Sequence, residues 1–398
     1  MYTTSNYVNR GVKFINNTMR PGRKKLSTLM IYGTDICDSM CKHCLIWAKR
    51  PVKHLPKKQI IEIMKSKCVT KSTTVGLEGG EFLLHPEAFE ILDWFYTNHP
   101  NFDLLSNCLK PEKVIEAVKK YPPQRLFISL DGGRDTYKYM RGKDGYHKVI
   151  EVIEACKDLV PISAMFTLSP YNSFEDLDHV IGLCKKNDID VRVGIYNDIA
   201  LFDTIEKAHE MEIGSARNLK DATVKEVKKK QKVEIERADD LDESEKQRTL
   251  QYKDFFKDQI PQSVRDTPEN LDFLFLYDEW RKGHAQLKCY SILDSAVIHP
   301  NGDVPICQNL DTKLGNIYEQ SLDEVLNSSQ SCQTQKSYVN NCNKCWINFH
   351  RKYDIIMLRT LEKFLPRSVI EIFYGKYKWC FDGDLSYREF MKKCDSPN

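Results

Sequence analysis

The chain has 398 residues, of which 41% are hydrophobic and 29% are charged, an ordinary balance for a soluble globular protein. Its 59 basic and 56 acidic residues leave a formal net charge of +3, so the chain is not strongly basic. We therefore expect no nucleic-acid partner. The sequence has neither a signal-peptide core at its start nor a run of about 18 apolar residues, so we expect a cytoplasmic protein without membrane contact.

Strand-like and helix-like segments alternate from residue 27 to about residue 198. The strand-like segments are 27–33, 73–80, 102–108, 125–133, 161–169 and 190–198. The helix-like segments between them are 57–67, 85–98, 111–121, 147–159 and 174–187. This alternation predicts consecutive βαβ units and a parallel sheet, in an α/β fold of the partial (β/α)6 TIM-like barrel type. In such sheets the functional side chains lie at the carboxyl ends of the strands.

The rest of the chain differs in composition from this barrel core, which we place at 27–204. We expect an N-terminal extension, 1–26, that is too short to form a further domain. A charged helical insertion or connector, 205–285, is expected to complete the core. We expect a small C-terminal cysteine-rich domain at 286–350. A helical, aromatic-rich tail at 351–398 is expected to pack back on the barrel.

The first of two cysteine groups directly follows the first strand-like segment. Cys37, Cys41 and Cys44 stand in a C-x3-C-x2-C pattern, in a chain whose 14 cysteines are expected to be reduced thiols and metal ligands. A structural zinc site takes four ligands, and full ligation of a [4Fe–4S] cluster also takes four cysteines. Three thiolates leave one iron of such a cluster open to an outside ligand. The loop therefore indicates an open metal centre, with structural zinc as the alternative.

This loop is followed by LEGGEFLLHP (77–86), ISLDGG (128–133) and MRGKDGYHKVI (140–150). Together these segments resemble the radical SAM superfamily. The resemblance implies a [4Fe–4S] cluster on the three cysteines, with S-adenosylmethionine on the open iron. The cofactor-binding residues that it implies are Gly79, Gly80 and Glu81 for the methionine ammonium, Ser129 and Asp131 for other polar groups, and Arg141 for the methionine carboxylate. The chain departs from the family at Phe82, which replaces a proline, and at Cys108, which replaces the glycine of a TNG segment matched by Ser106 and Asn107.

The second cysteine group has the form C-x12-G-x4-C followed by C-x2-C, and its members are Cys289, Cys307, Cys342 and Cys345. It resembles the SPASM and twitch domains of radical SAM enzymes, which implies a fully ligated auxiliary [4Fe–4S] cluster. Position 351, a further cysteine in the full SPASM pattern, is arginine, which favours one auxiliary cluster over two. Cys332 is a competing fourth ligand, and Cys380 and Cys394 are available to a second cluster. A zinc knuckle at the C-x2-C pair is the other alternative.

The resemblance implies reductive cleavage of S-adenosylmethionine to a 5′-deoxyadenosyl radical, which takes hydrogen from a substrate carbon. An external one-electron donor such as flavodoxin or ferredoxin is then required. The single auxiliary cluster favours a radical SAM oxidoreductase that oxidises a small molecule, such as a sugar, a cyclitol or a cofactor precursor. The alternative is an enzyme that modifies a peptide or protein, as in ribosomal peptide maturation. An alternative of another class is a non-catalytic zinc or iron–sulfur protein.

The catalytic base is not assigned by any motif. In the sulfatase-maturing branch of the family, an aspartate follows the cysteine of the G-x4-C element and serves as base, and here that position is Gln308. Tyr290 and Asp294 are candidate proton acceptors. Four further cysteines within helix-like or strand-like segments are expected to be small buried residues. They are Cys68, Cys108, Cys156 and Cys184.

Overall fold

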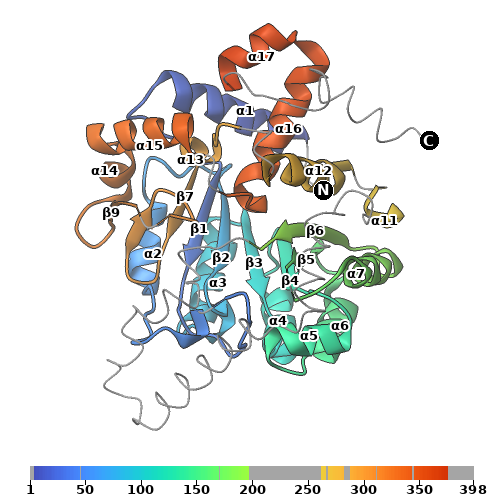
Figure 1. Cartoon of the computed structure of the whole chain (residues 1–398). Coiled ribbons are helices and arrows are strands. Elements are labelled where there is room, and N and C mark those ends of the chain that lie inside the picture. The colour runs from blue at the N-terminus through green and yellow to red at the C-terminus, as the bar shows by residue number, and fades with distance from the viewer. Residues whose placement is uncertain are drawn as a thin grey trace, which may run out of the picture.

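The computed structural model describes residues 4–44, 46–169, 171–196, 261–265, 268–281, 287–310, 312–342 and 345–374. At its centre lies a seven-stranded sheet with the order β6-β5-β4-β3-β2-β1-β7, in which every pairing is parallel (Figure 1). Its strands are β1 Thr28–Tyr32, β2 Thr74–Glu78, β3 Phe102–Ser106, β4 Arg125–Ser129, β5 Ile162–Leu168, β6 Asp190–Ile195 and β7 Ser295–Ile298. The predicted α/β partial barrel is confirmed.

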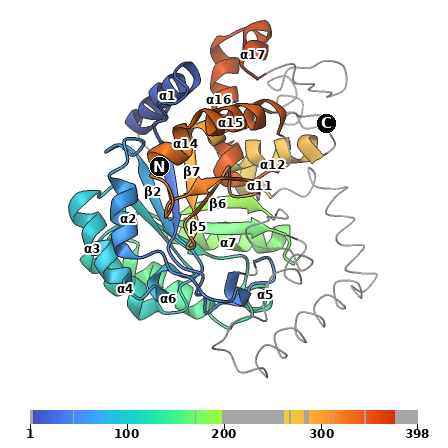
Figure 2. The same cartoon turned by 90° about the vertical axis from the view of Figure 1, so that its left-hand side faces the viewer.

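Helices cover the convex face of the sheet, and further helices from both ends of the chain lie at its other side (Figures 1 and 2). The helices between strands are α2 Lys57–Met64, α3 Ala88–Asn98, α4 Pro111–Lys120, α5 Arg134–Arg141, α6 Tyr146–Cys156 and α7 Phe174–Lys186, with short 3-10 turns at Ile46–Ala48 and Phe82–Leu84. The remaining helices are α1 Thr4–Met19, α11 Gln262–Arg265, α12 Pro268–Arg281, α13 Ser291–Asp294, α14 Leu322–Asn327, α15 Ser329–Asn341, α16 Asn348–Phe364 and α17 Arg367–Tyr374. Within the described ranges, no helix combines the length and the apolar composition needed to cross a membrane.

The strands alternate between an apolar and a polar face. Leu29, Leu77 and Leu104 belong to the buried core under the helices, because side chains alternate sides along a strand. The neighbouring positions line the inner face, and several of them are polar. Among these are Thr28, Thr74, Glu78, Asp103 and Arg125. A polar inner face with an apolar outer face leaves the concave side of the partial barrel to bind ligands rather than to form the core.

The seventh strand comes from the cysteine-rich segment and was not expected in the sheet. β7 pairs with β1 in parallel, with Thr28 opposite Ser295 and Ile31 opposite Ile298. This pairing satisfies the backbone edge of β1, which would otherwise stay open. A separate hairpin, β8 Asp303–Pro305 with β9 Lys313–Asn316, follows it. The segment therefore extends the barrel sheet as well as carrying cysteines, and its boundaries at 286 and 350 stay predictions.

The C-terminal helices lie against the barrel. α16 packs against α12 and β6, and α13 packs against α1, α15 and α16. Figure 1 shows α16 and α12 together near β6, with α17 extending away from the sheet. The expected charged insertion at 205–285 lies mostly outside the described residues, since only α11 and α12 and the residue before α11 belong to the described part of it. The part of the predicted tail beyond residue 374 also lies outside them.

Candidate active site

The Gly79–Gly80–Glu81 turn after β2 holds the first half of the cysteine loop. The Gly80 amide donates to the Thr34 carbonyl at 2.7 Å, and the Glu81 amide donates to the Ile36 carbonyl at 2.6 Å. A Cβ atom on Gly80 would lie 2.0 Å from the Ile36 oxygen, closer than any real contact. Gly79 has a φ of +147°, which only glycine adopts readily. These glycines are therefore required because the backbone of the turn lies against the backbone of the cysteine loop. The family resemblance alone implies only a role for them in binding the cofactor.

The Arg141–Gly142 segment holds the second half of the same loop. The Met40 amide donates to the Arg141 carbonyl at 3.0 Å, and the Lys42 amide donates to the Met140 carbonyl at 2.9 Å. Gly142 ends α5 with a φ of +66°, and a Cβ there would lie 2.8 Å from the Met40 oxygen. Segments about 60 residues apart in sequence thus form two sides of one cradle for the loop.

The three thiols of the loop lie close together. Burial raises the pKa of Cys37 and of Cys44, the latter to about 12, and the next largest cause for both is the neighbouring thiol of Cys41. The Cys41 sulfur lies 3.1 Å from the Ser39 hydroxyl and accepts from Arg141 Nη1 at 3.5 Å, and the Cys37 sulfur accepts from Asn107 Nδ2 at 3.7 Å. Neighbouring buried thiolates repel one another unless cationic metal offsets their charge. Three such thiols in one loop are the donor set that a [4Fe–4S] cluster takes at three irons, although no three such side chains of the described residues lie close enough together to hold a single metal ion.

Glu81 is buried beside this loop and has fixed hydrogen-bond donors. Its carboxylate accepts from the Ser106 hydroxyl at 3.0 Å and from the Asn107 amide at 2.7 Å. Burial raises the pKa of Glu81 to about 7. Ser106 and Asn107, the weaker match to the family pattern, therefore lie at the same site as Glu81. All three line a cavity along the inner face of the sheet.

Asp131 differs from its predicted position. It is fully buried, and it accepts from Arg141 Nε at 2.7 Å and from the Thr167 amide at 2.9 Å. A second guanidinium nitrogen of Arg141 also pairs with it. Because Asp131 is fully buried and does not line the cavity, it positions Arg141 instead of facing the cofactor. Ser129 and Arg141 do line the cavity, as predicted for cofactor-binding residues.

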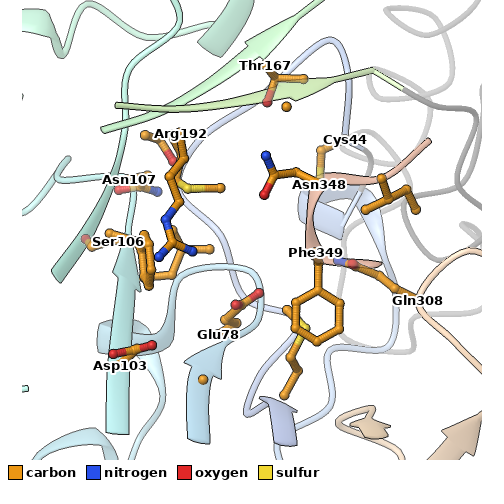
Figure 3. Close-up of a pocket in the computed structure, with 18 of the residues that line it drawn as sticks. Cys44, Glu78, Asp103, Ser106, Asn107, Thr167, Arg192, Gln308, Asn348 and Phe349 are labelled. Atoms are coloured by element: carbon orange, nitrogen blue, oxygen red, sulfur yellow. The ribbon is translucent and has the colours of Figure 1, made fainter. Parts of the chain in front are cut away.

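A cavity of about 750 Å³ extends from the cysteine loop along the inner face of the sheet. Residues from β1, β2, β3, β4 and β6 line it on one side, and residues from α16 line it on the other (Figure 3). Several polar lining residues were missed by the sequence analysis. They are Tyr32, Glu78, Asp103, Arg192 and Asn348, and they are joined by Gln308, which the sequence marks only as the replacement of a family aspartate. The available signal was a charged residue within an otherwise largely apolar strand, as Glu78 and Asp103 show.

The second cysteine group is also brought together. Cys289, Cys307 and Cys345 are buried, and Cys342 is half-buried. Burial, together with the neighbouring thiols of Cys345 and Cys342, raises the pKa of Cys307 to about 12. Burial and Asp354 raise the pKa of Cys289 most, and Cys345 and Cys307 add smaller contributions. Four interacting thiols, three buried and one half-buried, match in number the four cysteines that an auxiliary cluster takes, one for each iron.

The alternatives for the second group are less well placed. Cys332 donates to the Asn327 carbonyl at 3.7 Å and lies near Lys24. Cys380 and Cys394 lie outside the described residues. Arg351, at the position of the missing SPASM cysteine, is 1% exposed and donates to the Cys345 carbonyl at 3.1 Å. The arginine therefore places a positive charge next to three of the four thiols, those of Cys289, Cys342 and Cys345.

The two candidate proton acceptors and the four isolated cysteines all lie away from the cofactor-binding residues in the sequence. Asp294 pairs with Arg10 at 2.9 Å, and Tyr290 packs edge-on against Phe14. Neither residue lines the cavity, so neither is placed to accept a proton from a substrate bound there. The four isolated cysteines are buried, as predicted. They are Cys68, Cys108, Cys156 and Cys184.

Comparison with known proteins gives matches for both cysteine-bearing regions. The radical SAM superfamily model matches residues 31–184, and the SPASM model, described as an iron-sulfur cluster-binding domain, matches residues 289–346. None of the curated proteins matches the chain. These two models match the regions in which the two groups of cysteines lie.

Several solved structures are similar in fold. Streptococcus suis SuiB bound to precursor peptide SuiA is 15% identical, with a TM-score of 0.51 and coverage of 89% of this chain and 77% of that one. SuiB bound to S-adenosylmethionine is 15% identical, with a TM-score of 0.50 and coverage of 93% and 84%. At this identity the similarity shows the fold. The two matches show a radical SAM domain followed by a SPASM iron–sulfur domain, and these domains imply a [4Fe–4S] cluster, S-adenosylmethionine and an auxiliary iron–sulfur centre as cofactors.

Proposed function

We propose that this radical SAM enzyme modifies a peptide or protein substrate. When bound, the cluster and S-adenosylmethionine supply a 5′-deoxyadenosyl radical that takes hydrogen from a substrate carbon. The fold similarity to SuiB, which was solved with its precursor peptide, covers 89% of this chain and favours a peptide over the small molecule preferred in the sequence analysis. The cavity of about 750 Å³ is within the usual range for a ligand site and has room for a cofactor with one reacting side chain.

The residues of the cysteine-loop cradle have separate proposed tasks. Cys37, Cys41 and Cys44 hold the cluster. Gly79, Gly80 and Glu81 keep the loop in place and receive the methionine ammonium, and Ser129 contacts another polar group. Arg141, kept in position by Asp131, binds the methionine carboxylate. Burial of this cradle excludes water from the reacting atoms.

The second cysteine group is proposed to hold a single auxiliary cluster. Its ligands are Cys289, Cys307, Cys342 and Cys345. Four cysteine ligands leave no open iron for the substrate, which favours a role in electron transfer and a net oxidation. An external one-electron donor such as flavodoxin or ferredoxin is required to reduce the cluster on the cysteine loop.

Incubation with candidate peptides tests the proposed substrate class. Anaerobically reconstituted protein, dithionite and S-adenosylmethionine are incubated with peptides encoded next to this gene, and each peptide is analysed by mass spectrometry. A mass change that requires S-adenosylmethionine, with one 5′-deoxyadenosine per modified peptide, is expected. If 5′-deoxyadenosine forms only with sugars, cyclitols or cofactor precursors and the peptides stay unchanged, the small-molecule alternative replaces this proposal.

A further inference from the structure

Three polar side chains form a row on the cavity wall. Gln308 Nε2 donates to the Tyr32 hydroxyl at 2.5 Å. Tyr32 lies directly opposite Glu78 in the parallel pairing of β1 with β2, and both residues line the cavity. All three residues line the cavity, and Figure 3 shows Glu78 and Gln308 among its lining side chains. Gln308 comes from the loop after β8, Tyr32 ends β1 and Glu78 ends β2, so the row joins the auxiliary-centre segment to the barrel.

The hydrogen bond between Gln308 and Tyr32 leaves an acceptor without a partner. The Gln308 amide nitrogen donates to the Tyr32 hydroxyl, so the nitrogen end of this amide is used within the protein. Gln308 Oε1 then has no hydrogen-bond partner, although the residue is only 7% exposed. Buried polar atoms are rarely left unsatisfied. A ligand donor at this position would satisfy the Gln308 oxygen.

Glu78 presents a second acceptor that lacks a cationic neighbour among the described residues. The groups that act on its carboxyl are Asp103, whose negative charge opposes ionisation, and Tyr32. The two arginines on this wall interact with other side chains. Arg125 pairs with Asp190 at 2.6 Å, and Arg192 stacks on the Phe127 ring and acts on Asp103. This part of the wall is therefore acidic and rich in acceptors.

We propose that the Glu78–Tyr32–Gln308 row binds a protonated primary amine of the substrate. An ammonium group carries three donors and no acceptor, which matches a carboxylate beside an amide oxygen. If the substrate is a peptide, as in the proposed function on which this step rests, the group is a lysine side chain. Glu78 directly precedes the Gly79–Gly80–Glu81 turn, so this side chain lies close to the proposed cofactor site.

Calorimetric binding of two matched probes tests the amine site. Nα-acetyl-lysine methylamide is compared with its uncharged norleucine analogue, on the anaerobically reconstituted enzyme with S-adenosylmethionine present. The lysine probe is expected to bind about tenfold more tightly, equivalent to about 1.4 kcal/mol. Glu78→Gln is expected to abolish this preference. Glu62→Gln, the same change on the exposed side of α2, is expected to preserve it.

Circular dichroism and iron content establish that each variant is folded and loaded, and Tyr32→Phe provides a second variant that breaks the row without removing a charge. Equal affinity for the two probes, or a preference that survives Glu78→Gln, would contradict the proposal. Tighter binding of an arginine probe than of the lysine probe would mean that the site binds a guanidinium instead of an ammonium, which would also contradict the proposal. If the lysine probe binds through Glu78 but no peptide is modified, the amine site stands and the peptide function fails. If peptides without lysine are modified equally well, the amine site alone fails.

Discussion

Glu78→Gln is expected to change how the stability of the protein depends on pH. Burial and the nearby Asp103 raise the pKa of Glu78 from 4.5 to about 8. Since one pKa unit is worth about 1.4 kcal/mol, ionising this carboxyl in the ligand-free cavity costs up to about 5 kcal/mol. A carboxyl with a raised pKa stabilises the fold fully below its unfolded pKa, and this contribution is lost as the pH rises through the folded value. The wild-type protein should therefore lose stability relative to the variant between pH 4.5 and about 8.

Urea unfolding under anaerobic conditions, at several pH values across this range, measures the effect. The difference in free energy of unfolding between Glu78→Gln and wild type should grow in favour of the variant as the pH rises, with about 5 kcal/mol as the upper limit. Glu62→Gln should follow the wild type. Parallel curves for Glu78→Gln and wild type would mean that Glu78 ionises normally, and they would refute the reasoning that this wall is acidic and dehydrated.

Three further changes test other parts of the site. Arg351→Met, made in a variant without the three loop cysteines, should lower the reduction potential of the auxiliary cluster by about 59 mV, which is a tenfold change in the reduced-to-oxidised ratio. Arg351→Lys keeps the positive charge and should leave the potential unchanged. Equal potentials for Arg351→Met and its parent in an EPR-monitored titration would show that the charge of Arg351 does not act on the cluster. Asp131→Ala should cost about 3–5 kcal/mol in urea unfolding, because it leaves Arg141 buried and unpaired. It should also weaken S-adenosylmethionine binding in calorimetry, and unchanged binding would show that Arg141 does not need this partner. Gly80→Ala should displace the cysteine loop, so that about half of the iron is lost while the auxiliary cluster remains; full iron content would contradict the close approach that the glycine permits.

The local features of the fold and site were predictable from the sequence, and the long-range ones were not. The six barrel strands and the two cysteine groups depend on residue types at short spacing, which a sequence displays directly. β7 pairs with a strand far away in sequence, and its four residues carry no signal for that partner. Asp131 occurs in a recognisable motif, but only the fold shows that its carboxylate is used by Arg141.

The row of Glu78, Tyr32 and Gln308 shows the same limit more strongly. Each residue belongs to a separate segment, and each follows or ends an ordinary short strand or hairpin. In the sequence, Gln308 stands out only as the residue that replaces a family aspartate. Its contact with Tyr32 exists because β7 brings the auxiliary-centre segment beside β1. Such a contact cannot be inferred without the sheet order.

Formation of 5′-deoxyadenosine tests the chemistry of the cysteine loop most directly. Anaerobically reconstituted protein is incubated with dithionite and S-adenosylmethionine, beside a variant in which Cys37, Cys41 and Cys44 are replaced by alanine. The brown wild-type protein should release 5′-deoxyadenosine, and the variant should release none while it keeps about four irons per chain on the auxiliary cysteines. Colourless protein with stoichiometric zinc, or 5′-deoxyadenosine formation that survives the triple replacement, would contradict the assignment of the loop.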